Sequence, residues 1–136
     1  VVENDFDVIV SNPPYIPTDV VATLMPEVSQ FEPREALDGK GDGLYFYSKI
    51  LEQCKNYMKQ DGYILFEIGC EQGDAVSTMM RLAGFSEVRV IKDLARNDRV
   101  VMGHLKRLRC ISCGASLMHR SYCITRDVMR IERNRL

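Results

Sequence analysis

The sequence lacks any run of about 18 or more apolar residues, the length that a membrane-spanning helix requires, so we expect no membrane partner. Its amino terminus also lacks a basic region followed by an apolar stretch, which argues against a secretory signal. The five cysteines are an odd number, and Cys54 and Cys70 fall inside expected regular elements, which argues against a disulfide framework. Together these absences favour the reducing environment of the cytoplasm.

An excess of charge of one sign is also lacking, since the formal net charge of the 136 residues is −1, but the charges are unevenly distributed. Residues 1–104 contain 10 Lys/Arg and 17 Asp/Glu, whereas residues 105–136 contain 8 and 2. This break predicts a folded part over 1–104 and a basic, Cys-containing tail over 105–136. We expect the tail to pack poorly or to be disordered, and we expect nucleic acid as a partner only through this tail, if at all.

Within the first part, the spacing of apolar residues predicts alternating strands and helices. The predicted strands are 6–11, 63–68 and the two arms of a hairpin over 87–104, and the predicted helices are 45–60 and 72–84. The apolar run at 6–11 is typical of a strand buried on both faces. The fold class is therefore α/β, half of a doubly wound, Rossmann-like sheet with an antiparallel edge hairpin.

The first predicted strand is followed by Asn12-Pro13-Pro14-Tyr15, at the edge of the sheet where α/β proteins bind ligands. A planar nitrogen, as in an amide or an exocyclic amine, is a poor nucleophile because its lone pair is delocalised. A site assists it by accepting both N–H hydrogens, which the Asn12 side chain and the Pro13 backbone carbonyl can do. The two prolines make the turn rigid, and Tyr15 offers a flat face to the planar group. Taken alone, the tetrapeptide is equally typical of a turn that ends a strand.

The surroundings of the tetrapeptide carry a longer match. The stretches VSNPPYIP, FEPREALDG, DGL, FY, ILFEIG, QG, AGF and KDLARNDRVVMG together resemble the HemK/PrmC family of S-adenosylmethionine-dependent methyltransferases, over about residues 4–104. This family methylates the glutamine side-chain amide of peptide chain release factors. The resemblance implies a protein-(glutamine-N(5)) methyltransferase with S-adenosylmethionine as cofactor and release factors as protein substrates.

The resemblance also implies roles for individual residues. Asn12, Pro13, Pro14 and Tyr15 bind the glutamine amide, Asn12 and Tyr15 are catalytic, and Asn12 also lies beside the cofactor. One small departure is Gly39-Lys40-Gly41, where the family has two glycines before an acidic residue.

A larger departure concerns the cofactor loop. The family's glycine-rich loop lies upstream of the NPPY strand, and this chain starts at that strand. The stretch GKGDG (39–43) follows a polar loop and is typical of a turn, whereas GCEQG (69–73) follows a strand but has only two glycines and an acid. We therefore expect the chain to be the C-terminal half of a methyltransferase domain, truncated and inactive alone.

Other readings remain open. A methyltransferase for another planar nitrogen, such as a ribosomal-protein glutamine or an adenine, is an alternative, because DNA adenine methyltransferases share the NPPY tetrapeptide. A non-catalytic fragment, or a binding module that acts through its basic tail, is an alternative of a different class. Glu67 and Glu71 are candidates for acid–base work, but carboxylates at strand ends more often accept backbone hydrogen bonds, so we interpret them as structural.

The tail contains a possible metal motif. Its four potential ligands are Cys110, Cys113, His119 and Cys123, in the order C-x2-C-x5-H-x3-C. Three thiolates and an imidazole would suit tetrahedral zinc. The start and span are similar to a retroviral-type zinc knuckle, but the histidine comes one place late and no glycine precedes it. We therefore expect no bound metal.

Overall fold

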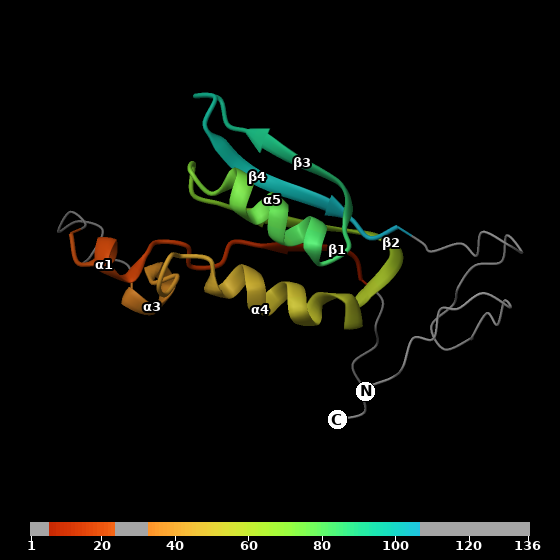
Figure 1. Cartoon of the computed structure of the whole chain (residues 1–136), viewed down its shortest axis with the longest axis horizontal. Coiled ribbons are helices and arrows are strands. Elements are labelled where there is room, and N and C mark those ends of the chain that lie inside the picture. The colour runs from red at the N-terminus through yellow and green to blue at the C-terminus, as the bar shows by residue number, and fades with distance from the viewer. Residues whose placement is uncertain (1–5, 24–32, 107–136) are drawn as a thin grey trace, which may run out of the picture. The chain divides into compact units, whose positions relative to one another are not determined.

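The computed structural model describes residues 6–23 and 33–106, which form one four-stranded sheet with helices (Figure 1). The elements are β1 (Phe6–Ser11), α1 (Thr18–Val21), α3 (Arg34–Leu37), α4 (Tyr45–Gln53), β2 (Met58–Glu67), α5 (Gly73–Leu82), β3 (Ser86–Lys92) and β4 (Asp98–His104). The helices α1 and α3 are single turns within the long connection between β1 and α4. No helix in this described part is long and apolar enough to cross a membrane.

The sheet has the strand order β1-β2-β4-β3. β1 and β2 are parallel, and β4 pairs antiparallel with both β2 and β3. The predicted parallel pair and the predicted antiparallel hairpin are therefore both confirmed. In the register, Ser11 lies beside Phe66 and Glu67 lies beside Val100. The carboxyl ends of β1 and β2 and the amino end of β4 therefore lie at the same end of the sheet.

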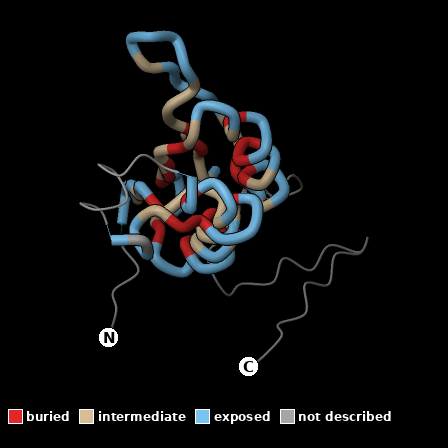
Figure 2. Tube along the Cα trace, turned by 90° about the vertical axis from the view of Figure 1, so that its left-hand side faces the viewer, coloured by how far each residue is buried: buried red, intermediate tan, exposed pale blue. Residues whose placement is uncertain are grey.

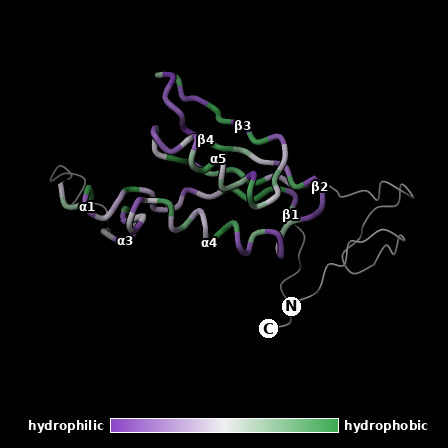
Figure 3. Tube along the Cα trace, viewed as in Figure 1, coloured by the Kyte–Doolittle hydropathy of each residue, from purple (hydrophilic) through white to green (hydrophobic). Residues whose placement is uncertain are grey.

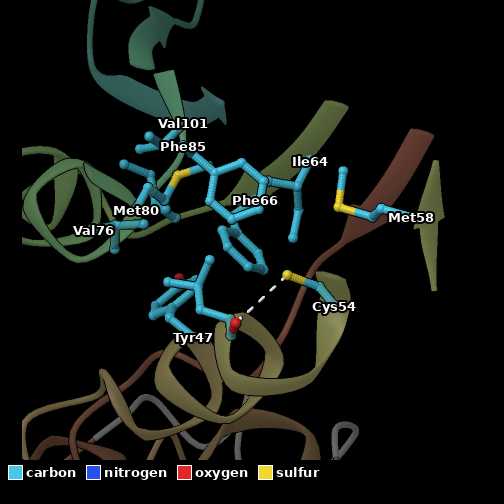
Figure 4. Packing of buried hydrophobic residues seen from close by; sticks show 11 residues of the cluster. Tyr47, Cys54, Met58, Ile64, Phe66, Val76, Met80, Phe85 and Val101 are labelled. Atoms are coloured by element: carbon cyan, nitrogen blue, oxygen red, sulfur yellow. Dashed lines mark hydrogen bonds between the residues drawn. The ribbon is translucent and has the colours of Figure 1, made fainter. Parts of the chain in front are cut away.

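The core lies between the sheet and the two longer helices. β2 turns Ile64 and Phe66 toward the helices, and Ile68, just beyond its end, is buried with them. The alternate side chains of β2 point to the opposite face. The core residues contributed by the other elements are Tyr47 and Leu51 of α4, Val76 and Met80 of α5, and Val101 of β4 (Figure 4). Buried residues are enclosed by exposed ones (Figure 2), and hydrophilic and hydrophobic residues alternate along α4 (Figure 3).

The prediction that residues 6–11 are buried on both faces is wrong. The side chains of Phe6, Val8 and Val10 are 55%, 49% and 73% exposed, and only Ile9 packs against the core. The reason is that, among the described residues, β2 is the one strand beside β1, and both longer helices cover the same face of the sheet. The apolar composition of the strand predicted burial on both faces, but the described elements cover only one face.

The predicted helix over 45–60 is too long. α4 ends at Gln53 and is followed by a 3-10 turn over Cys54–Asn56, and residues 58–60 already belong to β2. Pairing with β1 competes with the helix here, because the Phe6 amide donates to the Tyr57 carbonyl at 3.1 Å. The second predicted helix, 72–84, matches α5 within two residues at each end.

Candidate functional site

The segment that follows β1 lies at the edge where the described strands bring their ends together. Asn12 comes directly after Ser11, which pairs with Phe66 near the end of β2. The amide of Ile68, just beyond β2, donates to the carbonyl of Arg99 in β4 at 3.0 Å. The predicted position of the site at the carboxyl ends of the parallel strands is thus consistent with the sheet's topology.

The acceptors of this segment divide into occupied and free ones. The backbone carbonyls of Tyr15, Ile16 and Pro17 all accept hydrogen bonds from within the chain, the first from Gln72 and the second from Gly39. By contrast, no other described residue donates to the exposed Asn12 side chain or to the backbone carbonyls of Asn12, Pro13 and Pro14. The two acceptors that the sequence assigned to a substrate amide are therefore among those without a described donor.

A second segment, around Asp38, pairs with this loop through its backbone. Ile16 and Asp38 form an isolated parallel bridge, in which the Ile16 amide donates to the Leu37 carbonyl at 3.1 Å and the Gly39 amide donates to the Ile16 carbonyl at 2.8 Å. The stretch FEPREALDG, which was notable only through family resemblance, thus ends in a backbone pairing with NPPYIP. Sequence reasoning did not identify this contact.

Asp38 fixes the pairing through its carboxylate. Its Oδ1 accepts a hydrogen bond from the Thr18 hydroxyl at 2.6 Å and from the Lys40 amide at 2.9 Å, and Lys40 Nζ lies 3.3 Å from Oδ2. The Thr18 hydroxyl and then the Lys40 amide lower the pKa of this carboxyl below its ordinary value, against a smaller opposing effect of burial. The ionised form of Asp38 therefore ties the loop after β1 to the segment before α4.

Two glycines allow the close approach of these segments. A Cβ atom at Gly39 would lie 2.7 Å from the Cα atom of Tyr15, and a Cβ atom at Gly43 would collide with the Tyr15 carbonyl oxygen. Gly43 also has φ +80°, a conformation that side chains disfavour. The interpretation of GKGDG as a turn is consistent with the bond from the Gly43 amide to the Lys40 carbonyl at 2.6 Å, and the turn packs behind Tyr15.

The stretch GCEQG connects β2 to α5, but its glycines face the chain itself. A Cβ atom at Gly69 would lie 3.3 Å from the Tyr15 ring, and one at Gly73 would collide with the Asp98 carboxylate. The space beside each glycine is thus filled by another side chain instead of remaining open to a ligand. The interpretation that this stretch is no cofactor loop agrees with that packing.

The remaining predicted site residues lie at the same edge. Pro13 is buried and Pro14 is half-buried, whereas the Tyr15 ring is half-buried and has one side against Gly69. The catalytic and binding roles of these residues stay predictions. Of the two glutamates considered for acid–base work, Glu67 accepts a hydrogen bond from the Tyr47 hydroxyl through its backbone carbonyl, at 3.0 Å. Glu71 is exposed.

The described residues place Asn12, the residue predicted to lie beside S-adenosylmethionine, in an exposed position after β1. They place Gly39, Gly43, Gly69 and Gly73 against other atoms of the chain, and the binding of the cofactor stays a prediction. They also contain no group of three or more His, Cys, Asp or Glu side chains that could hold a metal ion. The predicted metal motif of the tail, Cys110 to Cys123, lies outside the described residues.

The comparisons with known proteins agree in sequence and in fold. No family model matches the chain. Over 100 residues it is 50% identical to the release factor glutamine methyltransferase of Caulobacter vibrioides, a match that covers 74% of this chain and 35% of that protein. Over 96 residues it is 51% identical to the protein of that name from Clostridium botulinum, covering 71% and 34%.

The chain therefore spans about a third of the length of these curated relatives. A methyltransferase from Pyrococcus furiosus resembles the structure with a TM-score of 0.52 at 19% identity, over 77% of this chain and 43% of that one. This second likeness concerns the fold alone, and it confirms the α/β class of a partial Rossmann-like sheet.

Proposed function

Because the matching part of the chain belongs to the release factor glutamine methyltransferase family, we propose that it forms the substrate side of a site for protein methylation. The methyl group passes from S-adenosylmethionine to the side-chain amide nitrogen of a glutamine in a peptide chain release factor. The site is completed by residues outside those described. The reaction belongs to translation termination and takes place in the cytoplasm, where the free thiols of Cys54 and Cys70 stay reduced.

The chemistry assigns one task to each group of the NPPY segment. When bound, S-adenosylmethionine would supply the methyl group, and its carbon–sulfur bond would break as the nitrogen–carbon bond forms. The positive charge that develops on nitrogen would strengthen the hydrogen bonds donated by its two N–H groups, and one of these protons would then be lost to water. The Asn12 side-chain oxygen and the Pro13 carbonyl accept these hydrogens, and they stabilise the transition state more than the ground state. The rigid prolines hold both acceptors in place, and the exposed side of the Tyr15 ring lies against the planar amide.

One observation carries this proposal. Along Asn12 to Pro17, the carbonyls of residues 15–17 accept hydrogen bonds from within the chain, whereas the Asn12 side chain and the carbonyls of residues 12–14 accept none from the described residues. The loop is thus held at Tyr15 and Ile16, while both acceptors proposed for the substrate amide have no described donor.

The test uses a chimera in which this chain replaces the matching segment of the Caulobacter vibrioides relative. We expect the chimera to methylate the Caulobacter release factor. Asn12→Ala should lower kcat/KM by about 10²–10³-fold, or about 2.7–4 kcal/mol, if losing this acceptor is comparable to losing an oxyanion-hole donor. The melting temperature should hardly change, because Asn12 is exposed. The matched control is Asn56→Ala, an exposed asparagine after α4.

The substrate class is decided in the same assay. Release factor, ribosomal proteins and DNA are offered in parallel with radiolabelled S-adenosylmethionine. Transfer of the radiolabelled methyl group to a ribosomal protein or to adenine, and not to the release factor, would show that the release factor is not the substrate. Folded chimera without transfer to any of the three would favour a non-catalytic chain. Equal losses from Asn12→Ala and Asn56→Ala would reject the role of Asn12.

A further inference from the structure

Gln72 is a half-buried residue between β2 and α5, and its side chain reaches a loop 57 residues earlier in the chain. Its Nε2 donates to the Tyr15 carbonyl at 3.0 Å and lies 3.5 Å from the Gly43 carbonyl. Its Oε1 accepts from the Gly69 amide at 3.1 Å. The side chain thus joins the loop after β1, the turn before α4 and the loop after β2.

The orientation of this amide is fixed by its partners. Two carbonyl oxygens face Nε2 and can only accept, whereas the Gly69 amide faces Oε1 and can only donate. The Tyr47 hydroxyl, 3.3 Å from Oε1 and 3.0 Å from the Glu67 carbonyl, has one hydrogen to donate to one of these two oxygens. A carboxylate in place of the amide would set its negative charge against both carbonyls.

We propose that Gln72 is a positioning residue for the NPPY segment: its amide fixes the main chain at Tyr15 and thereby aims the free acceptors of Asn12 and Pro13. This inference rests on the proposed function for its catalytic consequence. Gln72 does not reach the reacting atoms, since its hydrogen bonds lie on the Tyr15 carbonyl and on Gly43 and Gly69.

The intervening backbone is short and stiff enough to transmit the constraint. Between the Tyr15 carbonyl and the Asn12 side chain lie two prolines whose φ angles are locked by their rings. Gly39 and Gly43 close the space on the other side of Tyr15, so the loop has little room to relax. Losing the Nε2 donor removes the one side-chain hydrogen bond to the Tyr15 carbonyl in the described part of the chain.

The first arm of the test concerns the 136-residue chain itself and does not depend on activity. In Gln72→Glu, the two-dimensional NMR signals of Tyr15 and Ile16 should shift and broaden, whereas those of the core strand at Ile64 and Phe66 should stay in place. Gln60→Glu, the same change at an exposed position of β2, is the control and should leave the loop signals unchanged. Unchanged Tyr15 and Ile16 signals in Gln72→Glu would overturn the proposal.

The second arm is a double-mutant cycle in the chimera. Gln72→Glu should lower kcat by about 10–10²-fold with little change in KM for the release factor, as expected when an acceptor is misplaced by about 1 Å. In the Asn12→Ala background, the same substitution should cost less than about threefold, because the acceptor that it aims is already gone. Equal losses in both backgrounds would show that Gln72 serves stability only. An unsubstituted chimera that lacks activity would count against the proposed function, and the NMR arm would still decide the anchoring.

Discussion

Asp38 is the residue at which ionisation is most directly coupled to the geometry of the candidate site. Its carboxylate accepts a hydrogen bond from the Thr18 hydroxyl, just after the NPPYIP segment. It accepts another from the Lys40 amide, in the turn that packs against Tyr15. Both bonds favour the charged form, which is why its pKa is lowered from 3.8. A group whose pKa is lower in the folded state than in the unfolded state stabilises the fold only while it is ionised.

The resulting prediction concerns pH. Asp38→Asn should lower the melting temperature of the 136-residue chain at pH 7, because the neutral amide offers a weaker acceptor to both donors. The stabilisation by Asp38 is fully present above its ordinary pKa of 3.8 and is lost as the pH falls through the lowered folded-state value. Thermal melts from pH 7 to about pH 2 should therefore show the two proteins converging at the acid end.

Asp7→Asn is the control for this experiment. Its carboxylate is 77% exposed and pairs with Lys59 on the surface, where ion pairs contribute little. Its melting curve should follow that of the unsubstituted chain at every pH. A difference between Asp38→Asn and the unsubstituted chain that persists undiminished at pH 2 would contradict the assignment of the effect to ionisation.

At this scale, sequence reasoning assigned roles to residues of the loop but none to their partners. Asn12 and Pro13 were assigned from the chemistry of an amide and a fixed turn, both of which are local properties. Gln72 and Asp38 were not assigned, because their roles depend on contacts with Tyr15 and Thr18 that are 57 and 20 residues away in the chain. Periodicity and turn rules contain no information on such pairs.

At the scale of elements, β2 divides its two faces sharply. Phe66 is completely buried and meets the Tyr47 ring edge-on, with 5.3 Å between ring centroids and an interplanar angle of 77°. The neighbouring Leu65 points to the opposite face, is only half-buried and lies outside the core cluster. These two adjacent apolar residues should therefore contribute very different amounts to the free energy of unfolding.

Truncation of these two side chains should separate the faces. Phe66→Ala is expected to lower the free energy of unfolding by about 3–5 kcal/mol, since it leaves a cavity under both helices. Leu65→Ala, the matched control, should cost less than about 1.5 kcal/mol because little surrounding structure closes over it. Urea denaturation followed by circular dichroism measures both values. Similar losses for the two variants would contradict the one-sided core.

The exposure of β1 predicts that substitutions of its apolar residues cost little stability, which is the opposite of what its apolar composition suggests. Val10 is apolar and lies within β1, yet 73% of its surface is exposed. Val10→Thr in the 136-residue chain should therefore change the free energy of unfolding by no more than about 0.5 kcal/mol. Ile64→Thr, the same change in side-chain polarity at a fully buried position of β2, should be strongly destabilising because its hydroxyl enters the core. A large loss from Val10→Thr would mean that β1 is covered.

The elements show where sequence rules succeed and where they fail. The parallel pair, α5 and the hairpin were predicted because each has a clear period and clear turn residues at its ends. β1 was predicted to be buried because an apolar run indicates which residues avoid water, without indicating whether a neighbouring layer is present. α4 ended early because Tyr57 and Met58 pair with Phe6, and a helical stripe does not reveal that competition.

At the scale of the whole molecule, the proposed function assigns only the substrate side of the site to the described residues. In that proposal Asn12 and Pro13 bind the substrate amide, whereas a Cβ atom at Gly39, Gly43 or Gly69 would meet Tyr15 and one at Gly73 would meet Asp98. A ligand of the size of S-adenosylmethionine needs converging polar groups over most of its surface. A chain that spans about a third of its relatives' length should lack many of these contacts.

We therefore expect the 136-residue chain to bind S-adenosylmethionine very weakly and to show no turnover, whereas the chimera binds it. The cost of ordering the ligand must be met in full even when only part of the contacts form, so affinity falls steeply when half of a site is lost. Isothermal titration calorimetry on both proteins, with Asn12→Ala in the chimera as a third sample, measures this directly. Micromolar binding by the 136-residue chain would show that its own residues form the cofactor site, and the proposed division of the site would then be wrong.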